Sequence, residues 1–167
     1  RSVKIKGVCS HQDFGLTGKA VPDNIYRYRI AMLKEMGANG YRTAHYPHDP
    51  ATMDALDEMG FLVAAETRHY DSSPDALAQA EITVKRDRNR PSVICWLTGN
   101  EELYYHNVEQ GINIHKAMSA RIKQTDNTRL VSSAVGFPEK AIVHEATDFL
   151  GINYRFKEFD NIRAKYP

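Results

Sequence analysis

The chain has 167 residues, of which 42% are hydrophobic and 26% are charged, and its formal net charge is +1 at pH 7. Such a length and composition are those of one globular domain with a sizeable core, and they exclude a disordered or low-complexity chain. The balanced charge gives no electrostatic signal for nucleic acid or for an anionic membrane surface, so a neutral ligand is expected.

The ends of the chain and its cysteines give little information about its cellular compartment. No apolar run approaches membrane-spanning length and no signal-peptide pattern is present, while the start at Arg1 without a Met suggests an excerpt or a processed product. Cys9 and Cys95 both fall in apolar, strand-like runs. We therefore expect two buried free thiols rather than a disulfide or a metal pair, and the cellular compartment stays open.

Predicted strands and helices alternate along the chain. In chain order, strands are predicted at residues 3–8, 40–43, 61–65, 93–97, 130–134 and 149–153. Helices are predicted from Pro22 to Gly37, from Asp49 to Gly60, from Ser73 to just before Pro91, from about Val108 to Gln124, and from Asp160 to Tyr166. Capping residues, first-turn prolines and terminal glycines mark the first three helices.

The stretch from Asp87 to Glu102 is the most informative part of the sequence. Its apolar run at residues 93–97, entered through Pro91, is typical of a strand that is covered on both faces. Glu101 follows that strand at its C-terminal end, where α/β barrels carry their catalytic groups. Alternatively, Glu101 and Glu102 merely begin a helix and favour its N-terminal dipole.

Alternating strands and helices predict a parallel sheet with helices outside, either doubly wound or a barrel. Neither a G-x-G-x-x-G fingerprint nor a Walker lysine motif follows the first strand. Polar residues instead follow nearly every predicted strand, namely His11, Asp13, Arg42, His45, Glu66, Asn100, Glu101 and Tyr154. This layout favours a TIM (β/α)8 barrel, of which residues 1–167 form the first six strand-helix units as a single, partial domain.

Ordered motifs along nearly the whole chain carry a family resemblance. They are IKGVCSHQD at residues 5–13, LKEMGAN at 33–39, YRTAHYP at 41–47, MGFLV at 59–63, RDRNRPSVICW at 86–96 and GNE at 99–101. Together they resemble the catalytic barrel of glycoside hydrolase family 2, which contains β-galactosidases, β-glucuronidases and β-mannosidases. The resemblance implies a retaining β-glycosidase that acts on β-linked hexosides, with β-galactosides as the first expectation.

The resemblance also implies roles for individual residues. Glu101 would be the general acid/base and Asn100 would hold the 2-hydroxyl of the sugar. Arg42 and His45 would line the sugar-binding subsite. Tyr154 resembles the tyrosine that approaches the nucleophile.

Other positions are less typical of the family. His11 and Asp13 would lie at the floor or rim of the pocket. The segment AAETRH at residues 64–69 keeps Glu66 but lacks the acid that often precedes it in relatives. The family nucleophile, a second Glu after the seventh strand, is expected beyond Pro167, so this chain alone should be inactive.

The chemistry explains why two carboxyl groups are needed. Retention requires them about 5 to 5.5 Å apart, one to attack the anomeric carbon and one to protonate the departing oxygen. An ionised nucleophile raises the pKa of its neighbour, which therefore still holds a proton near neutral pH. No cofactor is expected, and a lone His11 where a metal hydrolase needs an H-x-H pair predicts no metal centre.

Several readings stay open. The chain could instead be a non-catalytic or degenerate barrel module that binds carbohydrate or serves a structural role, and homo-oligomerisation of the full-length protein is undecided. Trp96 is either a core aromatic or a sugar-stacking residue, and Tyr104 and Tyr105 form either a pocket wall or the barrel rim. The remaining histidines are expected to include surface residues: His48, His69, His106, His115 and His144.

Overall fold

A computed structural model describes residues 2–138 and 140–166. Its strands are β1 (Gly7–Ser10), β2 (Gly40–Thr43), β3 (Leu62–Glu66), β4 (Val93–Asn100), β5 (Leu130–Val135) and β6 (Gly151–Ile152). Its helices are α1 (Asp23–Glu35), α2 (Pro50–Glu58), α3 (Pro74–Asp87), α4 (Glu109–Thr125) and α5 (Phe159–Lys165), with 3-10 turns η1 (Tyr105–Asn107), η2 (Val143–Ala146) and η3 (Phe156–Glu158).

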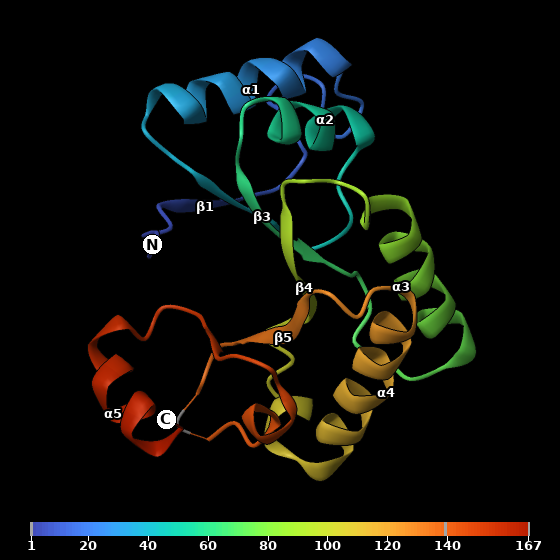
Figure 1. Ribbon diagram of the computed structural model, residues 1–167, viewed down its shortest axis with the longest axis vertical. Coiled ribbons are helices and arrows are strands. Elements are labelled where there is room, and N and C mark those ends of the chain that lie inside the picture. The colour runs from blue at the N-terminus through green and yellow to red at the C-terminus, as the bar shows by residue number, and fades with distance from the viewer. Residues whose placement is uncertain (1, 139, 167) are drawn as a thin grey trace.

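The strands form one parallel, six-stranded sheet in the order β1-β2-β3-β4-β5-β6. The sheet is curved, and Figure 1 shows α1 and α2 above it and α3 and α4 to its right, on the outer side. Sequential neighbours joined by outer helices are the arrangement of a TIM barrel. The prediction of six strand-helix units of such a barrel is confirmed.

Local signals in the sequence explain where the helices begin. The Asp49 carboxylate accepts a hydrogen bond from the Ala51 N–H at 2.9 Å, and the Ser73 hydroxyl accepts one from the Ala76 N–H at 3.4 Å. Pro50 and Pro74 occupy the first turns. These caps satisfy backbone donors that would otherwise lack partners, and they fix the loops that lead out of β2 and β3.

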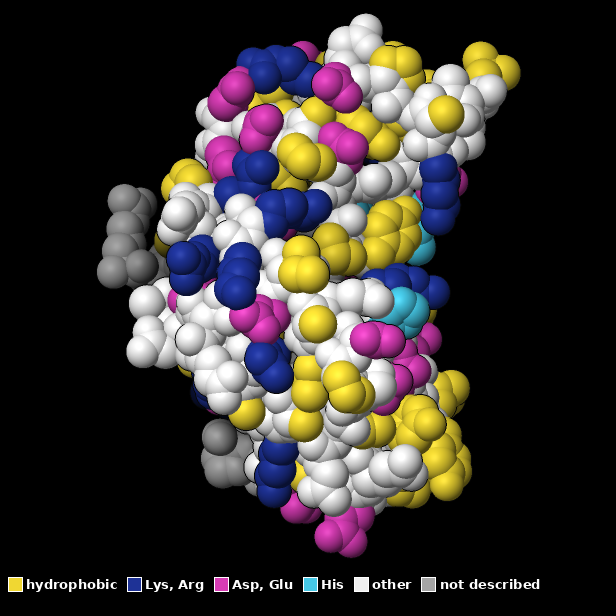
Figure 2. Space-filling view, turned by 90° about the vertical axis from the view of Figure 1, so that its right-hand side faces the viewer, with side chains coloured by type: hydrophobic (Ala, Val, Ile, Leu, Met, Phe, Trp, Pro, Cys, Tyr) yellow, Lys and Arg dark blue, Asp and Glu magenta, His cyan; other side chains and the backbone are white. Residues whose placement is uncertain are grey.

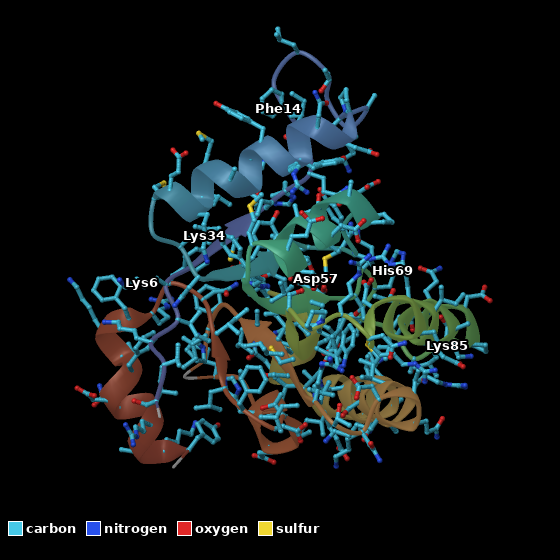
Figure 3. The ribbon with its side chains drawn as sticks, turned by 45° about the horizontal axis from the view of Figure 1, so that its top comes forward. Lys6, Phe14, Lys34, Asp57, His69 and Lys85 are labelled. Carbon is cyan, nitrogen blue, oxygen red and sulfur yellow. The ribbon has the colours of Figure 1, made fainter. Side chains whose placement is uncertain are left out.

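The core fills the space between the sheet and its outer helices. Trp96 is fully buried there, and its indole N–H donates to Asp126 Oδ2 at 3.0 Å. Trp96 is therefore a core residue and not a sugar-stacking platform. Arg90 anchors the start of β4 through ion pairs with Asp57 and Asp87, both at 2.9 Å; Asp57 is labelled in Figure 3.

The surface agrees with the balanced composition. On the face shown in Figure 2, acidic and basic side chains are interspersed, with neither sign covering the face. None of the helices in the described ranges is long and apolar enough to cross a membrane.

The structure corrects two expectations about the strands and thiols. Residues 3–6 do not join the sheet, because pairing begins only at Gly7 with Gly40, and the predicted sixth strand shortens to Gly151–Ile152. Cys9 is exposed and Cys95 is partly buried, so the prediction of two buried thiols was wrong for Cys9. Cys9 lies on β1, one of the two edge strands in the described part of the sheet.

The five histidines include one surface residue, as expected, and the other four lie inside the fold. His48, His106, His115 and His144 are buried, and only His69 is exposed. His115 Nδ1 lies 3.0 Å from the Thr98 hydroxyl, and His106 Nε2 lies 3.0 Å from the Ser133 hydroxyl. Helical periodicity did not reveal these partners, because Thr98 and Ser133 lie on strands far away in the sequence.

These buried histidines predict that acid destabilises the fold. Burial lowers the pKa of His106, His115 and His144 from 6.5 to about 4. The unfolded chain therefore binds more protons than the folded chain between pH 6.5 and 4. Stability should fall as the pH is lowered through this window, by up to about 3 kcal/mol for each histidine.

A single variant distinguishes protonation of a buried histidine from protonation of other groups at low pH. Neither ring nitrogen of His144 has a hydrogen-bond partner among the described residues, so His144→Leu should be tolerated. In the complete polypeptide, the loss of melting temperature between pH 6.5 and 4 should be smaller in this variant. The exposed His69→Leu should leave that slope unchanged, and an equal slope in all three proteins would contradict the prediction.

Candidate active site

Arg42, at the end of β2, is the centre of a polar cluster at the C-terminal edge of the sheet. Its Nε and Nη2 donate to the two carboxylate oxygens of Glu66 at 3.0 and 3.2 Å. Nη2 also donates to Asn100 Oδ1 at 2.7 Å, and Nη1 donates to Asn153 Oδ1 at 3.3 Å. One guanidinium thus connects the ends of β3 and β4 to the residue that follows β6.

Glu66 is almost completely buried, and three groups stabilise its charge or position. Besides the bidentate pair with Arg42, His45 Nδ1 lies 3.1 and 3.2 Å from its two oxygens. Its own N–H donates to the Thr43 hydroxyl at 2.8 Å. A buried carboxylate with this many partners is a fixed part of the framework that orients Arg42 and His45.

Asn153 links this cluster to Glu101 and was not among the predicted site residues. Its Nδ2 donates to Asn100 Oδ1 at 2.8 Å and to Glu101 Oε1 at 2.7 Å. The sequence signal that could have identified Asn153 is its position, since it directly follows the sixth strand and precedes Tyr154.

Glu101 and Tyr154 share an unusual backbone conformation. Their φ angles are +55° and +64°, in the left-handed region that residues with a Cβ seldom adopt. The Glu101 N–H still donates to the Ala134 carbonyl at 2.8 Å, so the residue stays attached to β5. A hydrogen bond with Glu101 and the charge of that carboxylate raise the pKa of Tyr154, although Tyr154 is 76% exposed.

Gly99 allows the Tyr70 ring to pack closely against β4. A Cβ at this position would lie 2.8 Å from Cδ2 of Tyr70, whose hydroxyl donates to the Gly111 carbonyl at 2.7 Å. The glycine in the Gly-Asn-Glu motif is therefore required for packing, and the Tyr70 ring holds the strand that presents Asn100 and Glu101.

The structure brings six of the eight predicted residues together: Arg42, His45, Glu66, Asn100, Glu101 and Tyr154. Asn153 joins them. His11 touches only the edge of the group, with its ring centroid 5.3 Å from that of His45. Within the described residues, the Asp13 side chain has no hydrogen bond or ion pair with the cluster; its backbone carbonyl accepts from Arg29.

Two hollows adjoin the cluster, one lined in part by Asn100 and the other in part by Glu101. A pocket of about 110 Å³ includes His45, Glu66 and Glu102 in its lining, and burial raises the pKa of Glu102. A larger pocket of about 350 Å³ has Glu101 and Tyr154 in its wall. Over the described ranges, no group of three or more His, Cys, Asp or Glu residues is placed to hold a metal ion.

Tyr104 and Tyr105 differ in their surroundings. Tyr104 is 70% exposed, whereas Tyr105 packs against the small apolar cluster of Tyr70, Ile114 and Met118. Neither tyrosine lines the two hollows described above.

Comparisons with known proteins identify the family of this chain. The family described as "Glycosyl hydrolases family 2, TIM barrel domain" matches residues 1–73 and 69–159. A β-galactosidase of Bacteroides ovatus is 29% identical over all of this chain, and a putative β-glucuronidase of Formosa agariphila is 35% identical over 99% of it. The chain spans 25% and 17% of these relatives.

Solved structures are similar over the same residues. A family 2 glycosyl hydrolase of Bacteroides cellulosilyticus superposes with a TM-score of 0.88 at 31% identity, covering 100% of this chain and 24% of that protein. The β-glucuronidase of Ruminococcus gnavus, solved with D-glucuronic acid, has a TM-score of 0.81 at 28% identity, covering 92% of this chain and 28% of that protein. From these matches, this chain belongs to glycosyl hydrolase family 2 and forms part of its TIM barrel domain.

Proposed function

We propose that the complete polypeptide is a retaining β-glycosidase that hydrolyses β-linked hexosides, and that Glu101 is its general acid/base. The observation that carries the proposal is the link from Arg42 through Asn153 to the carboxylate of Glu101. The link joins a carboxyl group in the wall of a pocket to an array of hydrogen-bonding groups. Residues 1–167 are proposed to act as one unit of that enzyme.

The reaction proceeds in two displacements. A carboxylate from outside the described residues attacks the anomeric carbon, the bond to the glycosidic oxygen breaks, and Glu101 gives its proton to that oxygen. Glu101 then takes a proton from water, whose oxygen attacks the anomeric carbon and releases the enzyme carboxylate. Glu66 is unsuited to the attacking role, because Arg42 engages both of its oxygens.

The orientation of the Asn100 amide supports a role in sugar binding. Its Oδ1 accepts hydrogen bonds from Arg42 Nη2 and from Asn153 Nδ2. Both nitrogens are donors only, so the Asn100 atom that they contact must be the amide oxygen. The amide Nδ2 therefore has no partner among the described residues and is left to donate to a sugar hydroxyl. Such a bond strengthens as the oxocarbenium-like transition state forms.

The preferred sugar is proposed to be galactose, with glucuronic acid as the second candidate. Both activities occur in the names of the relatives. A panel of chromogenic β-glycosides assayed with the complete polypeptide decides between them. Turnover should be fastest with the β-galactoside, whereas binding without turnover of any glycoside would favour a non-catalytic carbohydrate-binding module.

Gly136 provides a test of how tightly Glu101 is held. A Cβ at this position would lie 3.3 Å from Cγ of Glu101 and 3.2 Å from a methyl group of Leu103. Gly136→Ala should therefore displace the carboxyl group and lower kcat by about 10-fold, with a smaller change in KM. Gly15→Ala is the matched control, because its added methyl meets nothing within 4 Å. Unchanged kcat in Gly136→Ala would show that Glu101 is not confined there.

A further inference from the structure

Strand β4 is irregular directly before Glu101. Leu97 pairs with Ser132 of β5. The next pair joins Asn100 to Ala134, so three steps along β4 match two steps along β5, and the extra residue makes a bulge in β4. A bulge bends its strand and re-aims the side chains beside it. The position of Glu101 therefore depends on how firmly the bulge before it is held.

Ser133, on β5, holds the bulge at Gly99 through its side chain. Its hydroxyl donates to the Gly99 carbonyl at 3.2 Å and lies 3.0 Å from Nε2 of His106. A hydroxyl has one hydrogen, and that of Ser133 goes to the carbonyl, so Nε2 of His106 must be the donor in the second contact. Hydrogen bonds therefore run from the His106 ring through the Ser133 hydroxyl to the backbone of β4.

His106 is itself fixed by its neighbours. Its N–H donates to the Glu102 carbonyl at 2.8 Å. Its ring meets the ring of Tyr70 edge-on, with the two centroids 5.2 Å apart, and Tyr70 also lies against Gly99. The segment from Gly99 to His106, which contains Glu101, is thus closed into a loop whose two ends are joined through Ser133.

Stability alone does not account for a histidine at position 106. His106 is 1% exposed, and its Nδ1 has no hydrogen-bond partner among the described residues. Burial of that nitrogen costs free energy that an apolar side chain of similar size would avoid. The hydrogen bond from Nε2 to Ser133 is the contribution that an apolar side chain could not make.

We propose that His106 and Ser133 are positioning residues for Glu101, on which they act by fixing the Gly99 carbonyl two residues before it. The inference rests on the proposed function and adds two residues to its machinery. Both are buried, so they act through the backbone of β4 and not by contact with the sugar. Because a misplacement of about 1 Å can lower a rate by about 100-fold, even a small shift of Glu101 should be measurable.

The test compares a methyl and a dinitrophenyl β-glycoside of the preferred sugar, using the complete polypeptide. Only the departure of methanol needs the proton of Glu101, so the ratio of kcat/KM for methyl over dinitrophenyl reports the placement of that carboxyl group. Ser133→Ala and His106→Leu should each lower this ratio by about 10-fold. A loss of folded protein alone would lower both kcat/KM values equally and leave the ratio unchanged.

Two further variants serve as controls. Ser132→Ala removes a hydroxyl from the neighbouring, equally buried serine of β5, which donates to the Phe149 carbonyl and not to the bulge, so it should keep the ratio of the unmodified protein. His106→Gln offers an amide nitrogen to the Ser133 hydroxyl in place of Nε2. It should restore most of the ratio that His106→Leu loses.

An unchanged ratio in Ser133→Ala and His106→Leu overturns the inference, as does an equal fall in Ser132→Ala or a ratio in His106→Gln no higher than in His106→Leu. Glu101→Ala, measured on the same two substrates, distinguishes this failure from failure of the proposed function. If Glu101→Ala lowers the ratio and Ser133→Ala does not, only the positioning role is wrong. If Glu101→Ala also leaves the ratio unchanged, the proposed function itself is contradicted.

Discussion

Glu101→Ala should lower kcat/KM of the complete polypeptide on an unactivated alkyl β-glycoside by ~10²- to 10⁴-fold, the usual contribution of a general acid. Glycosides with good leaving groups need no proton, so their first step should be spared while hydrolysis of the glycosyl-enzyme slows. Azide, a nucleophile that needs no base, should then accelerate turnover and give the β-glycosyl azide. Steady-state rates with and without azide, and the product's configuration, are the measurements.

Glu102→Ala is the matched control for that experiment. Glu102 is the next residue, also carries a carboxyl group and is also partly buried, but it has no hydrogen bond with Asn153 and does not line the larger pocket. The Glu102→Ala variant should retain most of the activity, and azide should not accelerate its turnover. Full activity of Glu101→Ala on the alkyl glycoside would mean that another group supplies the proton.

The sequence predicted the framework because its signals are local. Proline, capping and apolar-run patterns reproduce β2 and locate α1, α2 and α3, and polar residues at successive strand ends identified six members of the cluster. The predicted boundaries were wrong where strand pairing depends on a neighbour. At residues 3–6 the Lys6 carbonyl accepts from the Gly40 N–H of β2, but paired strand begins only at Gly7.

The parts that could not be predicted depend on contacts between distant segments. The positive φ of Glu101 and the hydrogen bonds of Asn153 arise only once β4, β5 and β6 lie side by side. The same holds for His106 and His115, whose hydroxyl partners come from strands. A sequence shows which residues have side chains that can take part in catalysis or binding. Which groups those side chains contact is decided only by the fold.

Glu66→Ala should cause the largest loss of stability among single changes in the cluster. Arg42 is only 14% exposed at its side chain, so the variant leaves a mostly buried guanidinium without its carboxylate. Breaking such a pair costs about 3 to 5 kcal/mol. The melting temperature of the barrel should fall accordingly, and kcat/KM should fall with it because Arg42 also fixes Asn100. Glu58→Ala, which removes an ion pair with Arg27 that is more than half exposed, should cost less than about 1 kcal/mol.

A double variant distinguishes the structural from the chemical part of that effect. Glu66→Leu combined with Arg42→Leu removes both charges, so the double variant should be more stable than the sum of the single changes predicts. Its activity should nevertheless remain low, since one of the two donors that orient the Asn100 amide is gone and only Asn153 remains. If activity returns with stability, Arg42 serves only the fold. If stability does not return, the cost lies in packing around Glu66 and not in the unpaired charge.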